Sequence, residues 1–312
     1  MSAIVARQLT KRYGDLPAVD GLDLSIERGT LYGFLGPNGA GKTTTIRMAL
    51  GLIFPTSGEI SVLDEPVFAS ATPGVLRRVG ALVEEPGFWK YLSGRKNLEF
   101  FARAAGPAAD REARLGRIDD VLRTVDLQEA SGKKVKAYSQ GMRQRLGVAS
   151  SLLGAPELLV LDEPTNGLDP QGMRDMRRLL RRLADGGTTV FVSSHLLAEV
   201  EAICDRVGVL AQGRLVAEGP PSELRAASEL LRIDVDDRQS AQRIIAGLSG
   251  VQIEPREEGR PSLYVSLSPP ATPASVNAAL VHSGVAVSAL VPERATLEDV
   301  FIALVEGADV PR

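Results

Sequence analysis

The segment that most restricts the fold is a glycine-rich loop near the N-terminus. Residues 36–43 read Gly-Pro-Asn-Gly-Ala-Gly-Lys-Thr, so successive backbone N–H groups can converge on a polyphosphate while Lys42 adds a fixed positive charge. An apolar run, 31–35, precedes this loop, and a helical pattern, 44–50, follows it. This order places phosphates at the positive end of a helix dipole. We therefore expect an α/β fold of the P-loop NTPase class.

Hydrophobic patterns divide the first 220 residues into three kinds of structure. Alternating apolar and polar residues in 4–28 and 59–63 predict an antiparallel β subdomain with one wet face. Continuous apolar runs predict buried parallel strands covered on both faces; they are 31–35, 158–161, 189–192 and 207–210. Helical patterns predict a helical subdomain at about 87–155; its helices are 97–105, 111–125 and one that Ser139 opens and Gly154 closes.

A second domain is predicted after the Gly219-Pro220-Pro221 break, which divides the chain into domains 1–220 and 221–312. Its patterns follow the order strand, helix, hairpin, helix, strand; the segments are 230–235, 240–248, 251–267, 272–281 and 285–291. This βαββαβ order predicts a small α+β domain of ferredoxin-like type. Thr296 and Asp299 form a capping-box pattern for one further helix.

Composition narrows the classes of partner. The hydrophobic share of 44% and the charged share of 24% are typical of a folded globular chain. A net charge of −3 gives no general attraction to nucleic acid or to an anionic membrane. The sequence contains neither a run of about 18 apolar residues nor a signal-peptide pattern, so a membrane role requires a partner chain. The single cysteine, Cys204, is expected to be buried.

Two carboxylates follow the apolar run 158–161, where ligands of open α/β sheets bind. We expect Asp162 to hold Mg²⁺, usually through water, and Glu163 to polarise the attacking water as a general base. Thr43 is placed to bind Mg²⁺ and Thr44 to hydrogen-bond a phosphate oxygen. An exposed strand end explains most Asp-Glu pairs, and only the phosphate loop makes this pair functional.

His195 follows the strand pattern 189–193 and is expected to project at the same sheet edge, within reach of the terminal phosphate. Lone histidines are usually structural or exposed, so its position after that strand carries the functional interpretation. His282, in a predicted helix of the second domain, keeps the structural interpretation.

Together these motifs resemble those of a nucleotide-binding subunit of ABC transporters, over residues 1 to about 220. The resemblance implies that Tyr13 stacks on adenine, that Glu84 occupies the glutamine-loop position, and that residues 139–142 form the signature. It implies catalytic roles for Lys42, Glu84, Glu163 and His195. The implied nucleotide contacts are Tyr13, Gly36, Pro37, Asn38, Gly39, Ala40, Gly41, Lys42, Thr43, Thr44, Ser139, Gln140, Gly141, Met142 and Asp169, and the implied metal ligands are Thr43, Glu84 and Asp162.

The resemblance also implies a homodimer, because one chain supplies both halves of a composite site. Ser139 and the Gly141 backbone would contact the γ-phosphate of an ATP held by Lys42 of the other chain. Two residues depart from the family pattern. Glu84 replaces a glutamine and adds a carboxylate that can bind Mg²⁺, and Gln140 replaces a glycine, which restricts the backbone and reshapes the contact with the trans phosphate. We still expect hydrolysis.

Residues 84–101 contain five aromatic residues, Phe88, Trp89, Tyr91, Phe100 and Phe101. A subdomain core explains some of them, and Phe88 or Trp89 could also line a groove for a partner's helix. The resemblance implies that this partner is the membrane subunit. The segment 297–304 is similar to the C-terminal extension of ATPases from ABC-2 drug and antibiotic exporters. The expected function is thus ATP-driven export of a small molecule through a separate transmembrane permease, at the cytoplasmic face of the cell membrane.

The sequence argues against two other functions and leaves a third one open. A soluble ABC-type ATPase that acts on nucleic acid or ribosomes would usually have two nucleotide domains or long coiled coils, which are lacking here. No nucleic-acid partner is expected. A guanine-specific switch would need an Asn-Lys-x-Asp motif, and the sequence has none. The ATPase of a lipid or polysaccharide exporter stays an alternative, because the transported molecule would contact only the permease.

Overall fold

The computed structural model describes residues 1–69, 74–84, 87–104, 111–226, 229–254 and 262–294. These residues form two compact units, with the division between Pro220 and Pro221. The predicted helix that starts at Thr296 lies outside the described residues. Each unit is described below by itself.

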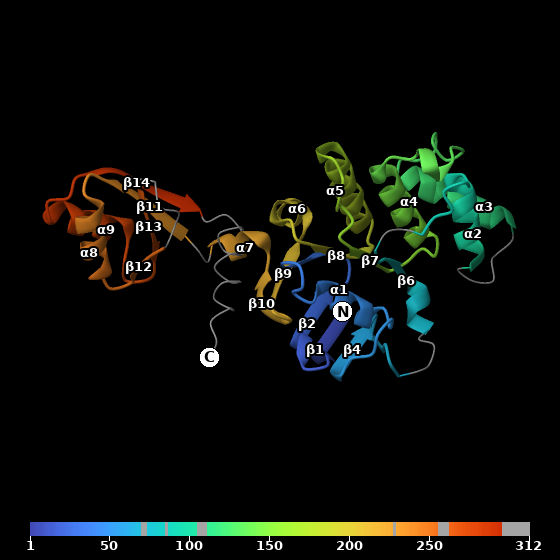
Figure 1. The fold of residues 1–312 in the computed structure, drawn as a ribbon, viewed down its shortest axis with the longest axis horizontal. Helices are drawn as coiled ribbons and strands as arrows, with labels where there is room; N and C mark the ends of the chain where they lie inside the picture. The colour runs from blue at the N-terminus through green and yellow to red at the C-terminus, as the bar shows by residue number, and fades with distance from the viewer. Residues whose placement is uncertain (70–73, 85–86, 105–110, 227–228, 255–261, 295–312) are drawn as a thin grey trace. The chain divides into compact units, whose positions relative to one another are not determined.

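The first unit begins with an antiparallel sheet. Its strands are β1 (Ser2–Tyr13), β2 (Leu16–Glu27), β4 (Ser57–Val62) and β5 (Glu65–Pro66), in the order β2-β1-β4-β5. The alternation predicted from the sequence is observed: Leu22, Leu24 and Ile26 are buried, whereas their neighbours Asp23, Ser25 and Glu27 are exposed. One face of the sheet therefore packs in the core, beside α1 (Lys42–Ala49) (Figure 1).

The second sheet carries the phosphate loop. Its strands are β3 (Leu31–Leu35), β6 (Val79–Leu82), β7 (Leu158–Asp162), β8 (Thr189–Ser194), β9 (Arg206–Ala211) and β10 (Arg214–Gly219). Their order is β10-β9-β3-β8-β7-β6, and only β10 pairs antiparallel to its neighbour. The predicted buried strands are confirmed. The sequence prediction lacks β6 and β10, because β6 has only four residues and β10 keeps most of its side chains partly exposed.

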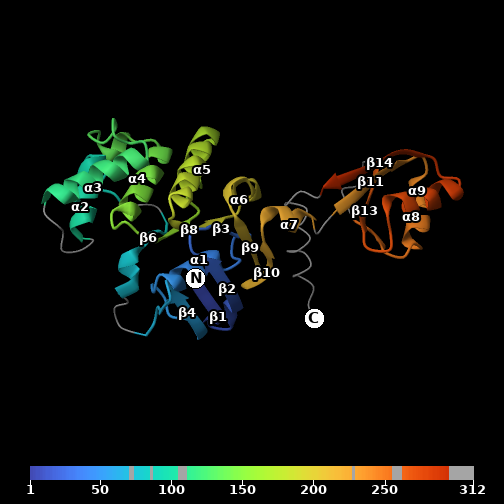
Figure 2. The ribbon, with the colours of Figure 1, turned by 180° about the vertical axis from the view of Figure 1, so that it is seen from behind.

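Helices flank this sheet and form a separate group at one end of the unit. The described helices are α1, η1 (Gly74–Arg78), α2 (Gly94–Ala104), α3 (Arg111–Thr124), η2 (Val135–Ala137), α4 (Gln140–Leu152), α5 (Pro170–Asp185) and α6 (Leu197–Ile203). Both views show α2, α3 and α4 side by side (Figures 1 and 2). They correspond to the three predicted helices of the helical subdomain, and Ser139 caps α4 as expected.

A glycine in the middle of β3 lets α6 approach the sheet. A Cβ at Gly33 would lie 2.3 Å from Val200 Cγ1 and 2.9 Å from Cys204 Sγ. Cys204 is buried, as predicted, and burial raises the pKa of its thiol well above the ordinary value. The thiol therefore stays protonated and packs as a small apolar group.

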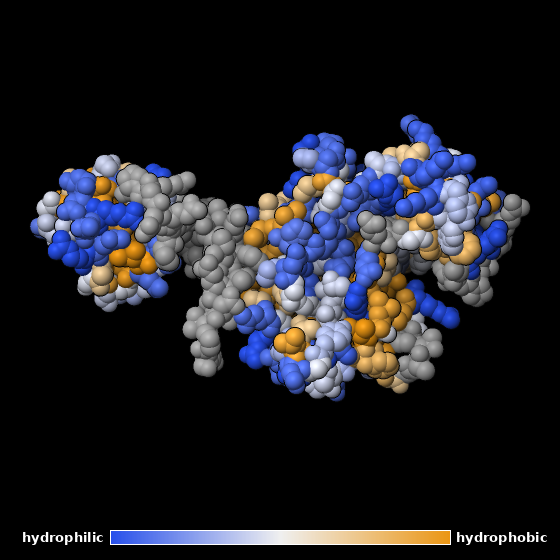
Figure 3. Space-filling model, in the orientation of Figure 1, coloured by the Kyte–Doolittle hydropathy of each residue, from blue (hydrophilic) through white to orange (hydrophobic). Residues whose placement is uncertain are grey.

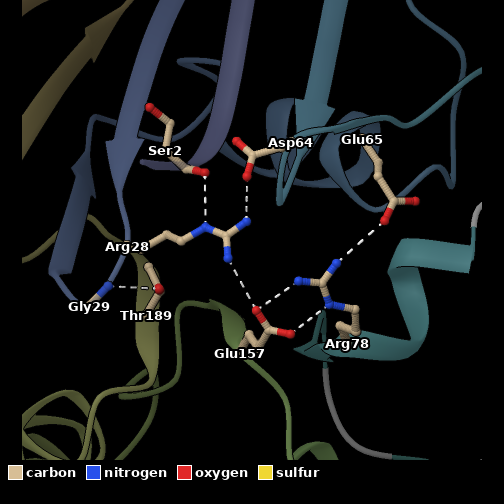
Figure 4. A network of polar contacts seen from close by, with 8 residues as sticks. All are labelled: Ser2, Arg28, Gly29, Asp64, Glu65, Arg78, Glu157 and Thr189. Carbon is tan, nitrogen blue, oxygen red and sulfur yellow. Dashed lines mark hydrogen bonds and ion pairs between the residues drawn. The ribbon is translucent and has the colours of Figure 1, made fainter.

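A polar network joins the two sheets at the end of β7 that lies away from the phosphate loop (Figure 4). Glu157 accepts hydrogen bonds from Arg78, at 2.6 and 2.8 Å, and from Arg28, at 3.3 Å. Arg28 also pairs with Asp64 at 2.7 Å. The Arg78 guanidinium lowers the pKa of Glu157 below its ordinary value. All four side chains are between 29% and 61% exposed, so these pairs contribute little to stability individually.

The second unit has the βαββαβ order that the sequence predicts. After α7 (Pro221–Ala226), its elements are β11 (Glu229–Val235), α8 (Arg238–Ala246), β12 (Val251–Ile253), β13 (Ser262–Leu267), α9 (Pro273–His282) and β14 (Val287–Arg294). The described strands form an antiparallel sheet in the order β12-β13-β11-β14. Thr272 and Ser275 form a capping box at the start of α9. Apolar residues of β11, β13, α8 and α9 make a core of their own.

An apolar surface lies next to β4 on the first unit (Figure 3). Leu52 and Phe54, in the segment before β4, are 62% and 71% exposed. The ring of Phe54 lies 4.9 Å from that of Phe68.

None of the helices in the described ranges is long and apolar enough to cross a bilayer.

Candidate functional site

The phosphate loop connects β3 to α1, and its glycines adopt conformations that other residues avoid. Gly39 and Gly41 have φ angles of 84° and 104°, in the left-handed region. A Cβ at Gly41 would lie 2.4 Å from the carbonyl oxygen of Ala18, on β2. The antiparallel sheet thus presses against the loop, and only glycine fits at this position.

Lys42, the first residue of α1, lies at the centre of the site and is 5% exposed. Its Nζ donates hydrogen bonds to the carbonyls of Gly36, at 2.7 Å, and Pro37, at 3.2 Å. It also lies 3.4 Å from Oε1 of Glu163. A buried ammonium group requires such hydrogen bonds and a nearby opposite charge. The Lys42 ammonium is therefore held where the N–H groups of the loop converge.

Asp162 ends β7 and binds two hydroxyl groups. Its Oδ2 accepts a hydrogen bond from Thr43 Oγ1 at 2.8 Å, and its Oδ1 accepts one from Ser193 Oγ at 2.5 Å. The carboxylate and the threonine hydroxyl, both predicted as metal ligands, are therefore adjacent. They are hard oxygen donors next to the phosphate loop, so this pair fits Mg²⁺, which binds through one or two protein oxygens together with phosphates.

Glu163 follows Asp162 with a φ of 47°, in the left-handed region. A non-glycine residue there is strained, and the backbone N–H of Glu163 is held by Ser193 Oγ, which accepts its hydrogen bond at 3.0 Å. The side chain lies between two predicted partners. Oε2 is 2.6 Å from Nδ1 of His195, and Oε1 faces Lys42. The fold therefore brings Lys42, Glu163 and His195 together, from the start of α1 and from the residues that follow β7 and β8.

Glu84 and Gln140 of the signature line a cavity of about 530 Å³ that Asp162 and Glu163 also line. Glu84 has a φ of 69° and its carboxylate is paired with Arg47, near the end of α1. This arginine competes with a metal ion for Glu84, which the sequence alone does not indicate. The fit of Glu84 to Mg²⁺ is thus weaker than that of Asp162.

The signature residues 139–142 begin α4. Ser139 Oγ accepts a hydrogen bond from the Met142 N–H at 3.2 Å and caps the helix. The positive end of the α4 dipole is therefore directed at the Ser139 hydroxyl. Gln140 is exposed, and its side-chain amide points to the loop after Glu163, where it donates to the carbonyl of Asn166 at 3.2 Å.

Two other predicted nucleotide contacts have defined surroundings. Tyr13 is 54% exposed, at the end of β1, and Lys11 Nζ lies 5.3 Å from its ring centroid. It belongs to the hairpin that contacts the phosphate loop through Ala18. Asp169 caps α5, with Oδ1 accepting from the Gly172 N–H at 2.8 Å. The structure gives Asp169 a helix-capping role, and nucleotide contact stays a proposal.

Sequence reasoning missed several residues that organise the site. Ser193 lies in the predicted strand 189–193, but its pairing in register with Asp162 is known only from the structure. Glu199, on α6, is 6% exposed and pairs with the hydroxyl of Thr165, just after Glu163. This contact ties the His195 loop to the Glu163 loop. The arginine-rich face of α5 is largely paired with aspartates, as expected for a solvated helix.

Comparison with known proteins identifies the family of this chain. Residues 19–166 match the family described as ABC transporter. The chain is 40% identical to the bacitracin transport ATP-binding protein BcrA of Bacillus licheniformis, over 99% of this chain and 100% of that protein. The chain belongs to the ATP-binding subunits of ABC transporters. The family expectation drawn from the motifs is thus confirmed.

Two further matches extend the comparison. This ABC subunit is 40% identical to the daunorubicin resistance ATP-binding protein DrrA3 of Streptomyces coeruleorubidus, over 97% of this chain and 96% of that protein. Among solved structures, cbiO1 from Clostridium perfringens, part of the ABC transporter complex cbiONQ, aligns with a TM-score of 0.67 and 26% identity. That alignment covers 79% of this chain and 96% of cbiO1. The fold is therefore that of an ABC ATPase cassette.

Proposed function

We propose that this ABC subunit hydrolyses ATP to drive export of an antibiotic-like or drug-like molecule through a separate transmembrane permease. The observation that carries the proposal is the placement of Glu163 between Lys42 and His195, at 3.4 and 2.6 Å. The substrate class is supported by the relatives of bacitracin transport and daunorubicin resistance, which align over nearly the whole chain.

Each residue of the site has a defined task in hydrolysis. Lys42 and the loop N–H groups bind the phosphates, so the ammonium exchanges the carbonyls of Gly36 and Pro37 for phosphate oxygens. The Glu163 carboxylate accepts a proton from the attacking water. His195, which contacts Glu163 through Nδ1, has its other ring nitrogen available for the γ-phosphate. Bound Mg²⁺, held by Thr43 and Asp162, would neutralise charge on the phosphates.

The proposed active form is a dimer in which each ATP contacts Lys42 of one chain and Ser139 of the other. Within the loop 36–43, Lys42 donates to the loop's own carbonyls and Thr43 donates to Asp162. The carbonyl of Ala40 accepts a hydrogen bond from the Gly213 N–H. The dipole of α4 is free to act on a phosphate beyond Ser139. Closure of two such sites, followed by hydrolysis and reopening, supplies the movement that drives the permease. The second unit is proposed to serve dimer contact or regulation.

The permease is proposed to dock at the aromatic cluster of the helical subdomain, which consists of Phe88, Trp89, Phe100 and Phe101. Their rings lie 4.2 to 6.3 Å apart. Phe88 is buried and shared with the cavity beside Glu84, whereas Phe100 is 52% exposed. The cluster thus joins the catalytic cavity to an accessible apolar surface. Attachment to the permease would hold the subunit at the cytoplasmic face of the membrane.

A mixing experiment tests the composite site. Lys42→Ala and Ser139→Ala chains are purified separately, and ATP hydrolysis is measured for each and for their mixture. Each variant alone is expected to be nearly inactive. The mixed dimer has one intact site, because Lys42 of one chain faces Ser139 of the other. Mixing should therefore restore activity above that of either variant, to at most about a quarter of the native value if half of the dimers are mixed.

The control for this experiment is Ser139→Thr, which keeps the capping hydroxyl and is expected to retain activity. Thermal melting of all variants excludes unfolding as the cause of inactivity. A mixture that stays as inactive as the separate variants, although both chains are folded, would contradict the two-chain site.

A further inference from the structure

The residue that departs from the signature pattern, Gln140, makes a specific contact within its own chain. Its Nε2 donates to the carbonyl oxygen of Asn166 at 3.2 Å. Asn166 belongs to the segment 163–169, which we call the base loop because it starts at Glu163. The segment ends at Asp169, which caps α5. The first turn of α4 is thus hydrogen-bonded to the middle of the base loop.

The shape of the base loop at Gly167 matches this side chain. Gly167 has a φ of 72°, and a Cβ there would lie 2.3 Å from Gln140 Nε2 and 3.1 Å from its Cδ. The amide of Gln140 therefore covers the Cα of Gly167 at close range. Gly167 is required for two independent reasons, namely its left-handed backbone and the space that Gln140 occupies.

The base loop can transmit a displacement at Asn166 to Glu163, because it is internally hydrogen-bonded. The N–H of Asn166 donates to the carbonyl of Glu163, and the N–H of Leu168 donates to that of Thr165, both at 3.1 Å. Glu163 itself is held in a left-handed conformation. A small change in the loop therefore alters the backbone that aims the Glu163 carboxylate.

We propose that Gln140 is a positioning residue that couples the signature to the base loop of the same chain. This inference rests on the proposed function, in which Ser139 contacts an ATP bound by the partner chain. When that ATP draws the start of α4 toward it, Gln140 carries Asn166 and Gly167 along and sets the position of Glu163. Occupancy of one site thereby controls the general base of the other site. A glycine at 140 has no side chain to make this link.

A double-mutant cycle tests the coupling. The turnover number kcat, KM for ATP and the Hill coefficient are measured for the native chain, Gln140→Gly, Gly167→Ala and the double variant. Gln140→Gly should lower kcat about fivefold, the worth of one hydrogen bond, with KM unchanged and a smaller Hill coefficient. Gly167→Ala should lower kcat more. Its effect should shrink about fivefold in the Gln140→Gly background, because the clash is then absent.

The cycle separates the contact from backbone strain, since Ala at the left-handed position 167 is strained in both backgrounds. Gln140→Met is the matched control, because it keeps the length of the side chain without the N–H donor. We expect it to behave like Gln140→Gly in kcat and Hill coefficient. Thermal melting confirms that all chains are folded.

Two results would overturn the proposal. Independent effects of the two substitutions, which multiply without coupling, would show that the contact does not matter for hydrolysis. A raised KM with an unchanged kcat in Gln140→Gly would show that Gln140 binds the nucleotide directly. Failure of the mixing experiment would remove the two-chain site, whereas failure of the cycle after successful mixing removes only the role of Gln140.

Discussion

The two ends of strand β7 carry polar clusters with opposite properties. At its start, Glu157 is shared by Arg28 and Arg78, and all three side chains are between 29% and 46% exposed. At its end, Glu163 is 21% exposed and faces Lys42, which is 5% exposed. Charges at the first end are solvated, and two arginines share one carboxylate there. Charges at the second end are largely removed from solvent. Desolvation strengthens every electrostatic interaction at the reactive end.

The backbone of the two glutamates also differs. Glu163 is held at a φ of 47°, and its N–H donates a hydrogen bond to Ser193 Oγ. Glu157 does not have a positive φ. Backbone strain in a folded protein persists only where the surroundings impose it. The comparison teaches that desolvated charge distinguishes the end proposed to perform chemistry, because left-handed residues occur near both ends, at Ala155 and Asp64 as well as at Glu163.

The largest expected effect is the loss of ATP turnover when Glu163 is replaced by glutamine. Glu163→Gln keeps the size of the side chain but removes the proton acceptor, so ATP turnover should fall by about 10²- to 10⁴-fold. ATP binding and the melting temperature should stay close to native values, and a closed ATP-bound dimer should accumulate. Phosphate release and size-exclusion chromatography with ATP measure these outcomes. Rapid turnover by this variant would exclude Glu163 as the base.

A smaller effect is expected from hydroxyl groups at the two ends of β8. Ser193→Ala removes the donor to Asp162 and the acceptor of the Glu163 N–H, so turnover should fall about tenfold. Thr189→Val is the matched control, because Thr189 Oγ1 accepts from the Gly29 N–H at 3.0 Å, at the far end of the strand. It should lower the melting temperature and leave kcat nearly unchanged. Equal kcat losses in both variants would contradict the division between the two ends.

The smallest effect is expected at the solvated end. Glu157→Ala should lower the melting temperature by no more than about 2–4 °C, because exposed ion pairs contribute little, and kcat should be unaffected. Since the folded-state pKa of Glu157 lies below its ordinary value of 4.5, its contribution is present above pH 4.5 and is lost as the pH falls through the folded-state pKa. The difference in melting temperature between native and variant chains should therefore vanish in acid. A difference that grows in acid would exclude the ion pairs as its source.

Much of the catalytic edge was predictable, because parallel strands end at one sheet edge. The phosphate loop, the Asp162–Glu163 pair and His195 each follow an apolar run, and this pattern alone places them together. Helix starts were predictable for a local reason, because the side chain that caps a helix lies directly before it, as at Ser139 and Thr272. Where residues interact within a turn, or follow parallel strands that end at one sheet edge, the sequence contains enough information.

Contacts between irregular segments were not predictable. The pairing of Arg47 with Glu84 and the contact of Gln140 with Gly167 depend on how α1 and α4 pack against loops. No periodicity encodes such packing. The sequence identified Gln140 as unusual, but only the structure shows that its partner is the loop that starts at Glu163. The role of Ser193 needed the register of β7 and β8.

The close approach of α6 to β3 at Gly33 ties an interior strand position to the helix that follows His195. Any side chain at 33 would push against Val200, and α6 follows directly after His195. Alanine at 33 would thus require smaller or displaced side chains at both 200 and 204, so the three positions should change together during divergence. An alignment of many family members would reveal this as correlated substitution at positions 33, 200 and 204.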